Sequence, residues 1–165
     1  NVSWGAISVH DVATMHFSES EASRYQLQRG DLMVCEGGAG VAEAAVWDGS
    51  TEMYYQKSLH RVRQRSDVPV VWLRYWLQLI KSVGVLDAQG NLATIPHLTG
   101  AQLRELRLVV PDDVEAICAR LTRAERETSG TRRQLERSID LLRERRRALI
   151  TAAVTGELEI PGAAA

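Results

Sequence analysis

The sequence predicts an α+β protein, in which a small β-rich domain with packed helices is followed by one long C-terminal helix. Residues 1–65 contain short apolar runs broken by turn residues, which is typical of strands. After Pro69 the apolar residues recur with the period of an α-helix, and after Pro111 they follow the period of a coiled coil. We therefore place the two domains at 1–111 and 112–165.

The N-terminal residues read as strands joined by turns. The run Leu32–Cys35 is continuously apolar and follows the turn sequence Arg29-Gly30-Asp31, which predicts a strand buried on both faces. Gly37–Gly40 predicts a turn with unusual backbone angles. It does not predict a phosphate-binding loop, because no Gly-Lys-Ser/Thr and no dinucleotide-binding motif accompanies it.

The last strand of this part is expected to carry arginines on one face. From Leu59 onward the side chains alternate, so that Arg61, Arg63 and Arg65 share a face opposite His60, Val62 and Gln64. These arginines have two interpretations. They form either a solvated face paired with acids, or a surface that contacts DNA phosphates and bases.

A core helix is predicted to pack on the sheet and to end near Gly84. Its expected buried positions are Trp72, Tyr75, Trp76, Leu79, Ile80 and Val83. The opposite side carries Arg74, Gln78 and Lys81. Gly90, Pro96 and Gly100 then mark a looped segment, and the run at 105–110 predicts a last strand.

The C-terminal domain is predicted to be one helix with a coiled-coil seam, which Asp112 or Asp113 can cap. The seam positions are Val114, Ile117, Leu121, Ala124, Thr128, Thr131, Leu135, Ser138, Leu142, Arg145, Leu149 and Ala152. A helix over 113–155 would be about 60 Å long, so its seam needs a second long helix. Gly130 costs about 1 kcal/mol relative to Ala and is a possible kink.

The arginine-rich end of this helix, Arg143–Arg147, has two interpretations. Cations in the last turns complement the helix dipole, and the flanking Leu142 and Leu149 indicate a buried face. Helix packing or partner docking is therefore favoured over direct DNA contact.

Composition excludes several classes of protein. The 20 basic residues, 18 of them Arg, are balanced by 21 acidic ones, so the chain is not a polycation. Cys35 and Cys118 have neither disulfide-framework nor zinc spacing. The most apolar window contains Arg74 and Lys81, which argues against a membrane span. Without a recognisable signal peptide, we expect a cytoplasmic protein.

No group of residues predicts an active site. His10-Asp11, His16 and Glu19 do not have the spacing of metal ligands. Cys35 has no obvious base partner, and Asp31 and Glu36 lack the nearby lysine of a metal-dependent nuclease. We therefore expect neither a metal site nor catalysis in this chain.

Three stretches of the chain resemble the specificity (S) subunits of type I restriction-modification enzymes. These stretches are YQLQRGDLMVCEGGAGV at 25–41, HLTGAQLRELRLVVP at 97–111 and LLRERRRALITAAVTGELEI at 141–160. Such subunits have target recognition domains (TRDs), each followed by a conserved helical region. The chain resembles one half of a subunit with two TRDs, and the beginning of its TRD would lie before Asn1. It departs from the pattern after Pro111, where Asp112 follows and Glu115-Ala116 replaces a Glu-Gln pair.

The resemblance implies a non-catalytic reader of double-stranded DNA. In this family the modification subunit carries the S-adenosylmethionine site, and the restriction subunit carries the ATP- and Mg-dependent nuclease and translocase. This chain would therefore hold no cofactor. Its helix would pair as an antiparallel coiled coil, with a second S half or with a second copy, so that two TRDs read a bipartite site.

The candidate site residues follow from two expected roles, DNA reading and helix pairing. Near the DNA we place Lys57, Arg61, Arg63, Asn91, Thr94 and His97. For helix pairing or partner docking we expect Leu121, Leu135, Leu142, Leu149 and Ala152. Two other functions stay open, namely a coiled-coil scaffold or regulatory protein with a protein-binding β-rich domain, and a small hydrolase or metal nuclease.

Overall fold

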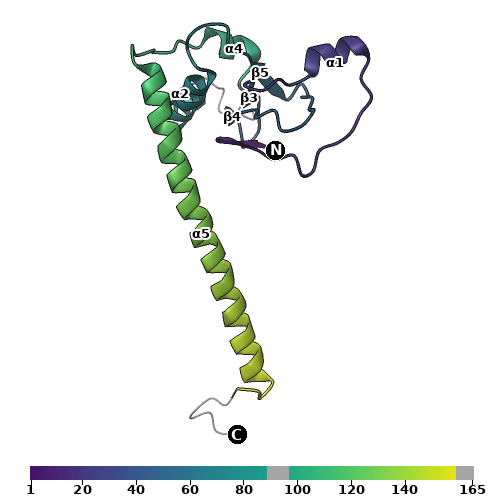
Figure 1. Cartoon of the computed structure of the whole chain (residues 1–165), viewed down its shortest axis with the longest axis vertical. Coiled ribbons are helices and arrows are strands. Elements are labelled where there is room, and N and C mark those ends of the chain that lie inside the picture. The colour runs from purple at the N-terminus through teal and green to yellow at the C-terminus, as the bar shows by residue number, and fades with distance from the viewer. Residues whose placement is uncertain (89–96, 159–165) are drawn as a thin grey trace. The chain divides into compact units, whose positions relative to one another are not determined.

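The structure, a computed structural model, describes residues 1–88 and 97–158 (Figure 1). The chain divides into two compact units, Asn1–Cys118 and Ala119–Ala165. The first unit holds small antiparallel sheets and short helices. The described residues of the second unit form one long helix, which is followed by a turn. The predicted α+β class with a long C-terminal helix is confirmed.

In the described part of the first unit, the strands form two antiparallel sheets. Strands β1 (Val2–Ser3) and β2 (Ala6–Ile7) make a hairpin. The second sheet has the order β4-β3-β5, with β3 (Leu32–Cys35) between β4 (Ala44–Val46) and β5 (Leu59–Val62). As the central strand, β3 is buried on both faces, as predicted, because its three apolar residues Leu32, Met33 and Val34 are at most 1% exposed.

Two features of this region differ from the sequence prediction. Helix α1 (Glu19–Tyr25) was not predicted, although Ser18 and Glu21 form a capping box at its start. Strand β5 ends at Val62, so only Arg61 belongs to the strand. The expected strand face with three arginines is therefore wrong, since Arg63 and Arg65 follow the strand.

Helix α2 (Val70–Ser82) confirms the predicted core helix and its end, since Gly84 has a φ of +74°. The predicted orientation is partly wrong. Leu79 and Val83 are 52% and 63% exposed, whereas the predicted outward residue Arg74 is buried. Ile80 lies in the core with β3, as predicted, and is joined there by Leu77, which was not predicted. Because α2 is apolar around most of its circumference, its periodicity did not select the face that packs.

The segment before the long helix also differs from the prediction. Helix α3 (Val85–Ala88) follows α2, and α4 (Gly100–Glu105) begins with a capping box formed by Thr99 and Gln102. The strand predicted at 105–110 is wrong, because no strand partner pairs with this segment in the described part of the chain. Leu106 packs against the core instead, and Trp72 Nε1 donates a hydrogen bond to the Val109 carbonyl at 3.0 Å.

Helix α5 (Val114–Val154) is continuous over 41 residues and passes through Gly130 without a break. Its first turns belong to the first unit, where Val114 and Cys118 are buried. The helix gives way to a turn at Gly156, whose φ of +76° is typical of a glycine after a helix end. In the described residues, no helix combines the length and the apolar character that crossing a bilayer requires.

Replacing Gly130 by alanine is expected to stabilise α5 by about 1 kcal/mol, because glycine is the poorer residue in a helix interior. No atom lies within 4 Å of an added Cβ, so the substitution introduces no clash within the chain. Thermal unfolding followed by circular dichroism at 222 nm would show a raised Tm. A lowered Tm would indicate that another helix approaches closely at this residue.

Candidate nucleic-acid interface

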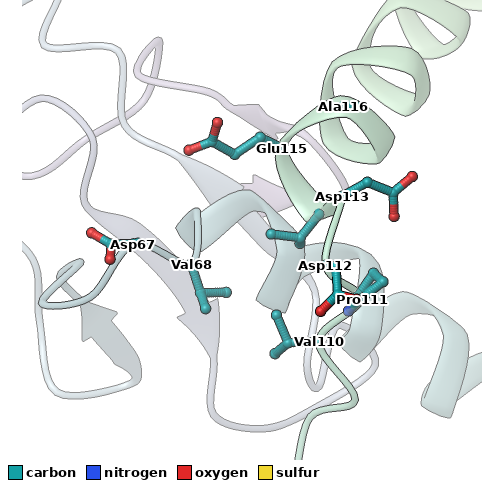
Figure 2. Close-up of a pocket in the computed structure, with 9 residues that line it drawn as sticks. Asp67, Val68, Val110, Pro111, Asp112, Asp113, Glu115 and Ala116 are labelled. Carbon is teal, nitrogen blue, oxygen red and sulfur yellow. The ribbon is translucent and has the colours of Figure 1, made fainter.

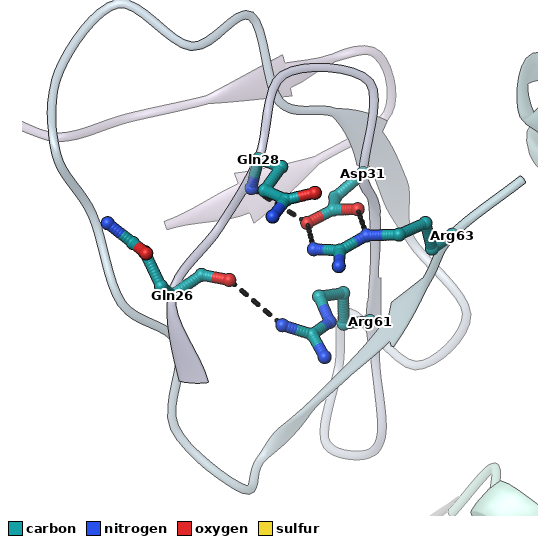
Figure 3. Close-up of polar contacts among 5 residues, drawn as sticks. All are labelled: Gln26, Gln28, Asp31, Arg61 and Arg63. Carbon is teal, nitrogen blue, oxygen red and sulfur yellow. Dashed lines mark hydrogen bonds and ion pairs between the residues drawn. The ribbon is translucent and has the colours of Figure 1, made fainter. Parts of the chain in front are cut away.

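The arginines at the end of β5 contact the loop that precedes β3 (Figure 3). The Arg61 Nη1 donates a hydrogen bond to the Gln26 carbonyl at 2.9 Å. Arg63 binds Asp31 in a bidentate manner, with Nε and Nη2 each 2.7 Å from a carboxylate oxygen. The two guanidinium groups therefore lie on the same side of the sheet, but each already has a partner within the chain.

Asp31 is a buried acid, since its side chain is only 1% exposed. Burial by itself raises the pKa of this carboxyl group. Hydrogen bonds from Arg63 and from the Gln28 backbone, together with the charges of Arg63 and Arg61, outweigh burial and lower the pKa of Asp31 below its ordinary 3.8. The same contact raises the pKa of Arg63. Asp31 therefore stays ionised at neutral pH and holds the Arg63 guanidinium in place.

Aromatic side chains gather beside Arg61. Tyr55 lies 5.2 Å from the Arg61 Cζ, measured to the ring centroid, and 5.5 Å from the Tyr25 ring. Phe17 stacks on Tyr54 at 4.6 Å and lies 6.4 Å from Tyr25. This arginine-aromatic cluster of Phe17, Tyr25, Tyr54, Tyr55 and Arg61 is half-buried. Rings and guanidinium planes of this kind can stack on nucleic-acid bases.

Lys57 and His97 lie at the other end of the three-stranded sheet. The Glu36 amide donates to the Ser58 carbonyl at 3.1 Å, and the Glu36 carbonyl accepts from the Leu98 amide at 2.6 Å. Glu36 thus lies between the two segments that carry Lys57 and His97, and both side chains are exposed. The structure therefore groups the predicted DNA residues in two places, Arg61 with Arg63 and Lys57 with His97. Asn91 and Thr94 lie outside the described residues.

The predicted pairing residues lie along α5. Leu121, Leu135, Leu142 and Leu149 are 37%, 59%, 62% and 47% exposed, and Ala152 is half-buried. Among the described residues of its own chain, this seam has no long helix packed against it. A long row of exposed leucines is unusual on the surface of a monomer, so the seam is a candidate interface.

Sequence reasoning missed two parts of this region. The acid partner of Arg63 was signalled only by the Gly30-Asp31 turn, and the aromatic cluster only by the adjacent residues Tyr54 and Tyr55. Within residues 1–88 and 97–158, no three His, Cys, Asp or Glu side chains are grouped so as to hold a metal ion. The chain matches no protein-family model, and a search of curated proteins found no match either.

Proposed function

We propose that this chain is one half of the specificity subunit of a type I restriction-modification enzyme. Its β-rich unit reads double-stranded DNA, and α5 pairs as an antiparallel coiled coil with a second long helix that carries the other reader. The chain itself is non-catalytic and cytoplasmic. Methylation and cleavage, with S-adenosylmethionine, ATP and Mg, belong to the modification and restriction subunits that it directs to a bipartite site.

One observation carries this proposal, namely that a compact α+β unit continues into a 41-residue helix with exposed leucines along one seam. At about 1.5 Å per residue, α5 is about 60 Å long. This length is of the order of one to two turns of duplex at about 34 Å per turn, so paired helices suit the spacing of two readers on DNA. The resemblance of 25–41, 97–111 and 141–160 to specificity subunits supports the same function.

The contacts of the arginines suggest which of them meets DNA. Arg63 uses two donors on the carboxylate of buried Asp31, so its role in the proposal is to hold the loop before β3. Arg61 has one hydrogen bond, from Nη1, and the other donors of its guanidinium can contact phosphate. Tyr55 fixes the position of this guanidinium by lying beside it. We therefore assign DNA contact to Arg61 and support of the loop to Arg63.

The Arg61→Ala variant tests this assignment in the assembled complex with the modification subunit. We expect weaker DNA binding and a salt slope of log K lower by about one, because one phosphate contact is lost. Fluorescence anisotropy between 50 and 200 mM salt measures both quantities. Arg107→Ala, which removes an exposed arginine outside the sheet, serves as the matched control. An unchanged affinity and slope for Arg61→Ala would remove Arg61 from the interface.

The second candidate is a coiled-coil scaffold whose β-rich unit binds protein. It is favoured by the internal pairing of Arg63 and by a net charge of only −1. A complex with the modification subunit that binds no specific DNA would support the scaffold. Methylome sequencing of a host that carries the intact system would instead give the recognised motif directly.

A further inference from the structure

The hollow at the start of α5, with a volume of about 520 Å³, combines an apolar surface with an acidic rim (Figure 2). Its apolar surface is formed by Val68, Val110 and Pro111. The acidic residues around it are Asp67, Asp112, Asp113 and Glu115. These four carboxylates come from two segments, the loop before α2 and the chain that enters α5. All four are exposed.

The carboxylates around the hollow form no ion pair within the described part of the chain. Among the ion pairs of the described residues, none involves Asp67, Asp112, Asp113 or Glu115. The opposite end of α5 has an excess of positive charge. Arg143 pairs with Asp140 at 3.3 Å, but none of the ion pairs of the described residues includes Arg145, Arg146 or Arg147. One end of this helix is therefore acidic and the other basic.

This charge distribution selects the orientation of two paired helices. In a parallel pair of identical chains, the acidic starts would face each other and so would the arginine-rich ends, and both contacts would be repulsive. In an antiparallel pair, each arginine-rich end lies beside the acidic start of the other copy. The helix dipoles also favour the antiparallel arrangement, because each positive N-terminus then lies beside a negative C-terminus.

The seam is self-complementary in the same orientation. Its ten positions from Val114 to Arg145 are symmetric about the bond between Ser129 and Gly130, so that an antiparallel pair can place Ile117 against Leu142 and Ala124 against Leu135, with Leu149 and Ala152 beyond the paired span. The same alignment brings Arg145 to the level of Val114. Val114 is already buried in the first unit. Arg145 of one copy therefore faces the acidic hollow of the other copy, and not an apolar seam residue.

We propose that the acidic hollow binds Arg145 and Arg146 of a second copy of this chain. The aliphatic part of an arginine packs on Val68 and Val110 while its guanidinium binds the carboxylates of the rim. This contact rests on the helix pairing proposed above and adds its register and its electrostatic basis. It requires neither DNA nor the other subunits.

Charge reversal on the whole chain, without DNA, tests the contact. The acid-reversed variant carries Asp67→Arg and Glu115→Arg, and the arginine-reversed variant carries Arg145→Glu and Arg146→Glu. We expect each variant alone to self-associate about tenfold more weakly, which corresponds to about 1.4 kcal/mol. In an equimolar mixture the affinity should recover, because one of the two contacts is then native and the other pairs the introduced arginines with the introduced glutamates. Analytical ultracentrifugation at low salt measures these constants.

The matched control is Arg104→Glu with Arg107→Glu, which makes the same charge change at exposed arginines outside the hollow and outside α5. It should leave association within about twofold. Circular dichroism checks that each variant keeps its helix content. Unchanged association of the reversed variants, or no recovery on mixing, overturns the contact even if replacement of a seam leucine still breaks the dimer. A wild-type chain that stays monomeric overturns both this contact and pairing between copies, but leaves the proposed DNA reading untouched.

Discussion

Replacing Leu142 by aspartate is expected to weaken self-association of the chain by two to three orders of magnitude. Leu142 is 62% exposed in the single chain and lies on the seam of α5. Burying a leucine is worth about 2 kcal/mol, and a symmetric pair loses this contribution at both copies. Each factor of ten in the dissociation constant corresponds to about 1.4 kcal/mol, so a loss of about 4 kcal/mol gives this range. Sedimentation equilibrium of the purified chain measures it.

Ile150→Asp is the matched control for this prediction. Ile150 is 54% exposed, comparable to Leu142, but it lies one residue beyond the seam position Leu149. The same substitution at Ile150 should therefore change the association much less. Equal effects at the two residues would show that the apolar surface of α5 acts without the register of a coiled coil. A monodisperse monomer for the wild-type chain at high concentration would contradict pairing between copies altogether.

Replacing Asp31 by asparagine is expected to lower the free energy of unfolding by about 2 to 4 kcal/mol. The carboxylate is buried and accepts two bonds from Arg63 and one from the Gln28 amide. Breaking a buried ion pair by removing one partner typically costs about 3 to 5 kcal/mol, and we expect less because Arg63 is 40% exposed and can be hydrated. Urea unfolding of the chain measures the change. Asp48→Asn, at an exposed acid, should leave stability nearly unchanged.

The pH dependence of Asp31→Asn distinguishes loss of this ion pair from a general packing defect. The pKa of Asp31 is lowered in the folded chain, so its ionised form stabilises the fold at pH values above its ordinary 3.8. As the pH falls through the lower pKa of the folded state, the wild type loses this contribution, whereas the variant has no such group to titrate. The difference in stability between the two proteins should therefore shrink below about pH 3.8. A difference that stays constant down to pH 2 would contradict the ionic origin of the effect.

Local sequence signals predicted the elements whose apolar pattern fits only one type of secondary structure. The continuous run Leu32–Cys35 became the buried central strand β3, and Gly84 and Gly156 lie just after the ends of α2 and α5. The three-four spacing after Pro111 predicted a helix over 113–155 with Gly130 as a possible kink, and the structure forms it over Val114–Val154 without a break. These features were predictable because strand patterns and helix ends depend on residues that are close in sequence.

The elements that the sequence missed depended on contacts between distant residues. The run at 105–110 has the composition of a strand, but a strand forms only where a partner offers its backbone groups, and the described structure provides none for this segment. The orientation of α2 depended on what covers Arg74, which lies beside Gly5 and over the Tyr75 ring. The roles of Arg61 and Arg63 could likewise not be read from alternation, because Asp31 and Gln26 reach them from another segment.

The sequence by itself determined the division into a part with short strands and a long C-terminal helix, because periodicity and turn residues act over a few neighbouring positions. It also predicted the seam of α5, which follows from residue spacing alone. Only the tertiary structure decided that Arg63 is bound by a buried acid, that α2 buries Leu77 and Arg74, and that acids from two segments surround one hollow. The physical reason is that burial and charge pairing depend on which distant segments meet, and residue spacing does not encode that choice.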